Sequence, residues 1–112
     1  MPQSTDQKWS QDDLIAFECA CDTIAELISA VSSLIADQQH HATADAQQIE
    51  RWEGVIQHLA LERLHLHVAD HLATKRIQRY PRPLDLISRL QTETTFDLSN
   101  FSRQNKVGYQ AL

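Results

Sequence analysis

Apolar residues recur three and four positions apart between Leu14 and Ile35, and this spacing is the strongest pattern in the chain. They fill the core positions of three successive heptads: Leu14, Phe17, Cys21, Ile24, Ile28, Val31 and Ile35. Ala20, Leu27 and Leu34 add a second row beside them. Because side chains at this spacing share one face of an α-helix, the segment predicts a helix that packs along its whole length, as in a coiled coil.

This first helix is predicted to begin after Ser10 and to end near Asp37. Ser10 can cap the helix, and Asp13 occupies the position from which a carboxylate returns the hydrogen bond to the cap. No glycine or proline interrupts the segment. Residues 38–44 break the apolar rhythm and are predicted to connect this helix to the next one.

A second helix is predicted from Asp45 to about Arg79, again as one uninterrupted segment. It ends where Tyr80-Pro81-Arg82-Pro83 follows, because proline disfavours helical geometry in the residue before it and cannot continue the hydrogen-bond ladder. A short third helix is predicted over residues 84–91. Its apolar side consists of Leu84, Ile87 and Leu90.

These elements predict an all-α fold: an antiparallel two-helix hairpin, a short third helix and an irregular C-terminal tail. We divide the chain into a flexible lead-in (residues 1–9), a helical domain (residues 10–91) and the tail (residues 92–112). A hairpin buries only one stripe of each of its helices, so another element or another chain has to cover the remainder.

The predicted second helix carries two apolar stripes. The first follows heptad spacing through Ile49, Trp52, Ile56, Leu59, Leu66, Ala73 and Ile77. The second begins halfway along the helix and consists of Leu61, Leu64, Val68 and Leu72. At about 100° per residue, its centre lies more than a quarter-turn from the first stripe. Since a helix that is apolar on two sides is buried on two sides, the second stripe needs a partner.

Three partners for this second stripe are compatible with the sequence. The third helix and the tail can fold back over it, two copies can associate into a four-helix arrangement, or the stripe can form a groove for a different protein. Arg63 and Asp70 interrupt the first stripe seven residues apart. In a dimer they would set the register of the seam, although exposure at the edge of the helix is the interpretation we favour.

Composition indicates the size of the domain and its expected location, but it does not point to a function. The chain has 112 residues, the size of one domain, and a formal net charge of −5. Residues 1–74 hold twelve acids and three bases, whereas residues 75–112 hold three acids and seven bases. No apolar run is long enough for a membrane span or a secretory signal, so we expect a cytoplasmic protein without membrane contact. Cys19 and Cys21 point to different sides of the helix and are not expected to form a disulfide.

Six histidines raise the question of a metal site. His67 and His71 are four residues apart, on one face of the predicted helix, and Glu62 with His65 forms the Glu-x-x-His unit found in di-iron helical bundles. However, His58 and His65 project to the opposite side from the first pair. The chain also lacks a glycine-rich phosphate loop, a glycine-flanked serine and a His-Glu-x-x-His motif. We therefore expect no cofactor, no metal and no enzymatic activity.

A basic cluster follows the second stripe and comprises Lys75, Arg76, Arg79 and Arg82. The first three share a helical face, and Tyr80 beside them is placed to stack on a nucleic-acid base. The alternative is a favourable position of cations at a helix C-terminus, where the helix dipole prefers positive charge.

From these patterns we expect a small interaction module: an adaptor, inhibitor, antitoxin-like or small regulatory protein. Its contact surface would be Leu61, Leu64, Val68 and Leu72, and its partner another protein or itself, as a homodimer. A nucleic-acid-binding regulator that uses Lys75, Arg76, Arg79 and Arg82 is the alternative. A metal-dependent helical-bundle enzyme ranks third.

Overall fold

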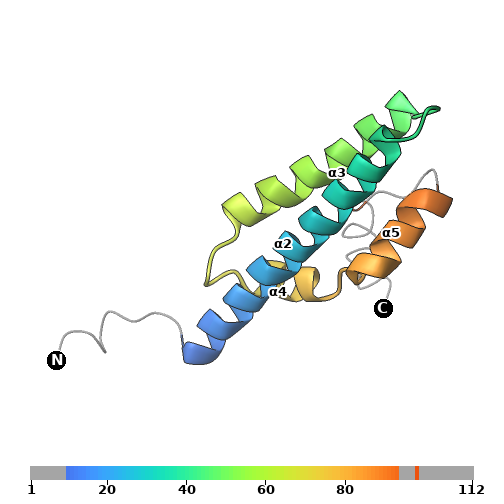
Figure 1. The fold of residues 1–112 in the computed structure, drawn as a ribbon. Coiled ribbons are helices and arrows are strands. Elements are labelled where there is room, and N and C mark those ends of the chain that lie inside the picture. Colours follow the sequence, from blue (N-terminus) through green and yellow to red (C-terminus); the bar gives the residue numbers. More distant parts are fainter. Residues whose placement is uncertain (1–9, 94–97, 99–112) are drawn as a thin grey trace, which may run out of the picture.

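The computed structural model describes residues 10–93 and residue 98. This part of the chain contains four α-helices and no strand, so the all-α prediction is confirmed. The helices are α2 (Gln11–Gln39), α3 (Ala46–His65), α4 (His71–Gln78) and α5 (Pro83–Thr92) (Figure 1). None of them is both long enough and apolar enough to span a membrane. The predicted lead-in and most of the predicted tail lie outside the described residues.

α2 begins where the capping pattern predicted. The Oγ of Ser10 accepts a hydrogen bond from the backbone N–H of Asp13 at 3.1 Å, and the Asp13 carboxylate accepts one from the Ser10 N–H at 3.0 Å. This reciprocal pair satisfies two of the N–H groups that a helix start leaves without a partner. The helix then runs to Gln39, two residues beyond the predicted end.

α2 is also the centre of the fold, because α3, α4 and α5 all pack against it. α3 runs along one side of α2, while α4 and α5 lie along the other (Figure 1). The row that is completely buried consists of Ala20, Ile24, Leu27 and Val31. Burial is therefore centred between the two predicted rows rather than on the heptad positions, of which Phe17, Cys21 and Ile28 are only partly buried. The shift follows from coverage by helices on two sides instead of one.

The predicted second helix is in fact two helices. α3 ends at His65, residues 66–70 form a connection, and α4 begins at His71. Leu66 leaves helical geometry with φ −70° and ψ 133°. Asp70 then caps α4 by accepting a hydrogen bond from the backbone N–H of Ala73 at 3.0 Å. Asp70 is thus the cap of α4, and both Asp70 and Arg63 are exposed.

The hydrophobic spacing did not predict this break, because the same spacing continues from α3 through the connection into α4. Leu66, Ala73 and Ile77 keep the seven- and four-residue intervals of one helix, and all three are buried. The connection redirects the chain from one side of α2 to the other while these residues stay in the core. Periodicity indicates which residues are buried. It cannot distinguish one straight helix from two helices joined by a short connection that bury the same positions.

α5 starts at Pro83, whose missing N–H suits the first position of a helix. Leu86 and Leu90 are buried, but Leu84 is 85% exposed, so the prediction that Leu84 belongs to the apolar side is wrong. α5 packs against α2 and does not cover the second stripe, so this part of the first option is wrong; the tail, the other part of that option, lies mostly outside the described residues. Leu98 also lies in the core.

Gly54 provides a test of the α3 backbone. It is exposed, and a Cβ placed there would meet nothing within 4 Å. Because glycine costs about 0.5–1 kcal/mol relative to alanine inside a helix, Gly54→Ala should raise the free energy of unfolding by that amount. Urea denaturation followed by circular dichroism measures the change. The reverse substitution at an exposed alanine of the same helix, Ala60→Gly, should lower the stability, and a destabilising Gly54→Ala would contradict the prediction.

Candidate interaction surface at the junction of α3 and α4

Glu62 links α3 directly to α4 and to Tyr80, the residue that follows the C-terminal cap of α4. The Glu62 carboxylate accepts hydrogen bonds from Nη2 and Nε of Arg76, at 3.1 and 3.3 Å, and from the Tyr80 hydroxyl at 2.7 Å. His58 Nε2 lies 3.8 Å from the same carboxylate. The Glu62 side chain is only 10% exposed, so these charge-assisted bonds are better shielded from water than those of a surface pair.

The contacts with Glu62 and Tyr80 stabilise the charged form of Arg76. Burial alone would lower the pKa of Arg76, but the hydrogen bond and the charge of Glu62, together with the neighbouring Tyr80 hydroxyl, raise that pKa above its ordinary value. Arg76 therefore remains a cation paired with Glu62. Its guanidinium is occupied inside the fold.

A pocket of about 300 Å³ opens between the end of α3 and α4. Its apolar lining comes from Leu61, Leu66 and Ala73. Its polar lining consists of His58, Glu62, His65, Asp70 and Arg76. This volume is at the lower end of the range for ligand pockets, and it can receive one large side chain of a partner.

Of the predicted second stripe, Leu61 lines this pocket, and the other three residues lie outside its lining. Leu61, Leu64 and Leu72 are 55%, 74% and 81% exposed, and Val68 is half-buried. They do not share one helix as predicted. Leu61 and Leu64 lie near the end of α3, Val68 lies in the connection, and Leu72 lies in the first turn of α4. Leu61 lines the pocket, and Leu72 directly precedes Ala73, which lines it from α4. We call these four residues the leucine surface.

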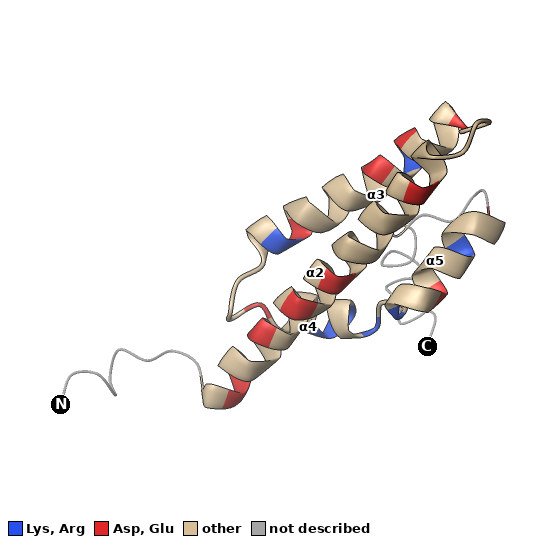
Figure 2. Ribbon diagram, in the orientation of Figure 1, with Lys and Arg blue, Asp and Glu red and all other residues tan. Residues whose placement is uncertain are grey.

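The predicted basic patch is reduced to three residues. Lys75, Arg79 and Arg82 are exposed, and we call them the basic corner; Figure 2 shows Lys and Arg gathered on α4 and on the segment that follows it. Arg76 pairs with Glu62. Tyr80 is buried with its hydroxyl on the same carboxylate, so the prediction that it can stack on a base is wrong.

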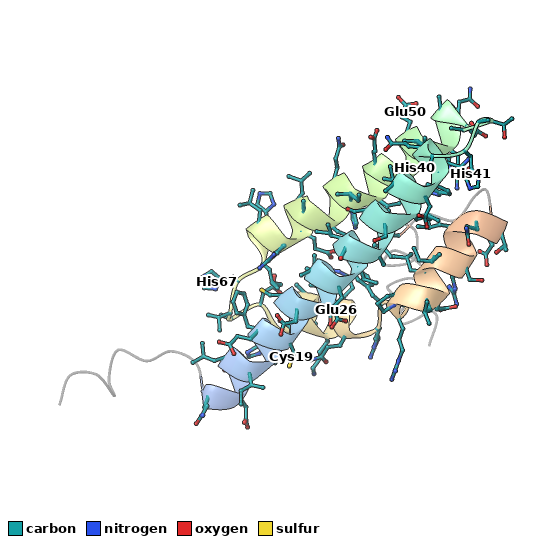
Figure 3. The ribbon with its side chains drawn as sticks, viewed as in Figure 1. Cys19, Glu26, His40, His41, Glu50 and His67 are labelled. Atoms are coloured by element: carbon teal, nitrogen blue, oxygen red, sulfur yellow. The ribbon has the colours of Figure 1, made fainter. Side chains whose placement is uncertain are left out.

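The histidines do not form a metal site within the described residues. His67 lies in the connection, where Nδ1 accepts from the Ala69 N–H at 3.3 Å, and His71 Nε2 lies 3.2 Å from the Asp13 carboxylate. The predicted helical pairing of His67 with His71 is wrong, because α3 ends at His65 and α4 begins only at His71, so the two residues do not share a helix. His40 and His41 are at the opposite end of α3 from His67 (Figure 3). No group of three or more His, Cys, Asp or Glu side chains in residues 10–93 and 98 could hold an ion.

Sequence reasoning missed the link between Glu62, Arg76 and Tyr80. Arg76 and Tyr80 lie 14 and 18 residues after Glu62, and helical spacing rules relate only residues three or four positions apart. One signal was present in the chain: Glu62 lies three residues after Leu59 and four before Leu66, between two core positions. A carboxylate on that face requires a buried partner, because an unpaired charge there is too costly.

Comparisons with protein-family models, with curated proteins and with solved structures gave no match for this chain. The functional inference is therefore based on the surfaces described above.

Replacing Glu62 tests how strongly this link stabilises the fold. Glu62→Gln keeps the size of the side chain but removes the charge that Arg76 requires. We expect the free energy of unfolding to fall by about 1–3 kcal/mol, in the lower half of that range because the Arg76 side chain is about one-third exposed. Urea denaturation measures the loss.

Two controls accompany this measurement. Glu53→Gln, at an exposed position of α3, should change stability by less than about 0.5 kcal/mol. A double-mutant cycle with Arg76→Gln should give a coupling free energy above about 0.5 kcal/mol. Purely additive losses would mean that the two side chains do not stabilise one another.

Proposed function

We propose that this chain is a non-enzymatic protein-interaction module that binds its partner through the leucine surface. The observation that carries the proposal is the exposure of three leucines, Leu61, Leu64 and Leu72, at the ends of two helices, with Leu61 also lining the pocket between them. Burial of a fully exposed leucine side chain is worth about 1.5–3 kcal/mol. Clusters of exposed apolar side chains next to a pocket are typical of the energetic centre of protein interfaces.

The helices that present this surface are held in place before any partner arrives. Glu62 ties α3 to α4 through Arg76 and Tyr80, and Asp70 caps the start of α4. A surface that is already ordered loses less conformational entropy when it binds. This supports a preformed docking site rather than a segment that folds on binding.

The partner is a second copy of the chain or a different protein, as for an adaptor, an inhibitor, an antitoxin-like protein or a small regulator. In the first case, the four-helix arrangement expected from two hairpins is replaced by an association of two chains, each with four helices in the part that the structure describes. In the second, the pocket between α3 and α4 would receive a side chain of the target.

A nucleic-acid-binding regulator is the alternative, in which Lys75, Arg79 and Arg82 contact phosphates. With Arg76 occupied by Glu62, three exposed cations remain at this corner, and the six carboxylates of α2 repel an approaching polyanion. Heparin chromatography tests this alternative. We expect the chain to pass through at low salt, and retention that declines steeply with salt would favour nucleic acid.

Substitutions on the leucine surface test the proposed function. Leu64→Asp and Leu72→Asp place a charge where a partner would bury an apolar side chain, so the affinity for the partner should fall at least tenfold. Because both leucines are exposed, helicity and melting temperature should remain close to those of the parent chain. Affinity capture with quantitative mass spectrometry measures binding, and circular dichroism measures folding.

Leu84→Asp is the matched control, because Leu84 is equally exposed but lies on α5 outside the leucine surface. It should leave binding unchanged. Equal loss of binding in all three variants, or loss of helicity in Leu64→Asp, would contradict the assignment of this surface.

A further inference from the structure

The exposed face of α2 is acidic. α2 contains six carboxylates and no Lys or Arg, and Figure 2 shows their red segments spaced along the helix. Ile15, Glu18, Asp22 and Glu26 follow one another at intervals of three or four residues, and all four are exposed. They therefore share one face of the helix. We call these four residues the acidic face; Ile15, 50% exposed, supplies its apolar end.

α4 and its C-terminal cap, Arg79, carry a strip of the same spacing and the opposite charge. The strip consists of three exposed residues, Leu72, Lys75 and Arg79. It begins with the apolar Leu72, and the two charged residues follow three and seven positions later. The acidic face has the same order, an apolar residue and then charges at three and seven positions. At 1.5 Å per residue the charges lie about 4.5 and 10.5 Å beyond the apolar residue on both helices. An α2 laid parallel to an α4 of another copy therefore brings Ile15 against Leu72 and sets Glu18 against Lys75 and Asp22 against Arg79.

The two strips adjoin at one end of the molecule. His71 Nε2 lies 3.2 Å from the Asp13 carboxylate, so the first turn of α4 contacts the first turn of α2. Within one chain the strips do not cover each other, because both are exposed. A two-fold axis beside this end brings the acidic face of each copy against the α4 of the other. Both complementary contacts then form at once, and the assembly closes as a dimer.

We propose that the partner is a second copy of this chain, bound about a two-fold axis with the acidic face of each copy on the leucine surface and basic corner of the other. This inference rests on the proposed function and identifies its partner. Contact of the leucine surface with itself is disfavoured, because it would bring two basic corners together. The leucines supply most of the affinity through burial, and the exposed charge pairs select the partner and its orientation.

The test uses the full chain and two charge-reversed variants. The acid-reversed variant is Glu18→Lys, Asp22→Lys and Glu26→Lys. The base-reversed variant is Lys75→Glu, Arg79→Glu and Arg82→Glu. Light scattering over a range of concentrations should give twice the 12.8 kDa chain mass for the parent protein and the single-chain mass for each variant alone. An equimolar mixture of the variants should return to the mass of a dimer, because both contacts again join opposite charges.

A third variant controls for the change in net charge. Asp37→Lys, Glu50→Lys and Glu53→Lys reverse three exposed carboxylates outside the acidic face and alter the net charge as much as the acid-reversed variant does. This variant should dimerise as the parent does. Should a triple variant lose helicity, Asp22→Lys and Arg79→Glu alone replace it, and each should raise the dissociation constant by about tenfold.

Three results would overturn the inference. A parent chain that keeps the mass of one copy at every concentration excludes the dimer, while the Leu64→Asp capture experiment still decides whether the leucine surface binds another protein. Dimers of both variants alone show that the charges do not select the contact. Failure of the mixture to dimerise, with both variants folded, excludes the pairing of the acidic face with the basic corner.

Discussion

The complete burial of one row of α2, from Ala20 through Ile24 and Leu27 to Val31, is the constraint on which the rest of the fold depends. α3, α4 and α5 each pack against α2 more extensively than they pack against one another. α3 covers α2 from one side, and α4 and α5 cover it from the other (Figure 1). The chain therefore has to cross from one side of α2 to the other, and it does so in the connection between α3 and α4.

That crossing explains why polar chemistry concentrates at one place. Leaving α3 at Leu66 and starting α4 at Asp70 brings two helix ends together, and helix ends expose backbone groups that require partners. Asp70 satisfies one of them, and Glu62 stabilises the junction through Arg76 and Tyr80. The pocket and the exposed leucines lie at the same junction, because two helices that diverge after a turn cannot pack along their full length.

Charge is sorted across the surface in a way that supports association. α2 holds carboxylates and no base, whereas the exposed charges of α4 and the segment after it are positive. Within the fold, Arg76 of α4 and Glu62 of α3 already form one such pair, with the carboxylate largely shielded from water. At the exposed strips the same complementarity is weaker for affinity but decides which surfaces can meet.

The sequence by itself determined the helical class, the capped start of α2, the starts of α3 and α5 within one or two residues, and most of the core. It also singled out Leu61, Leu64 and Leu72 as apolar side chains without a partner in the described chain. These properties are local, since caps, proline positions and periodicity act within a few residues. Only the tertiary structure decided the break at residues 66–70, the exposure of Leu84 and the pairing of Glu62 with Arg76 and Tyr80. Each of these depends on which side of α2 an element covers, and hydrophobic spacing carries no information about direction in space.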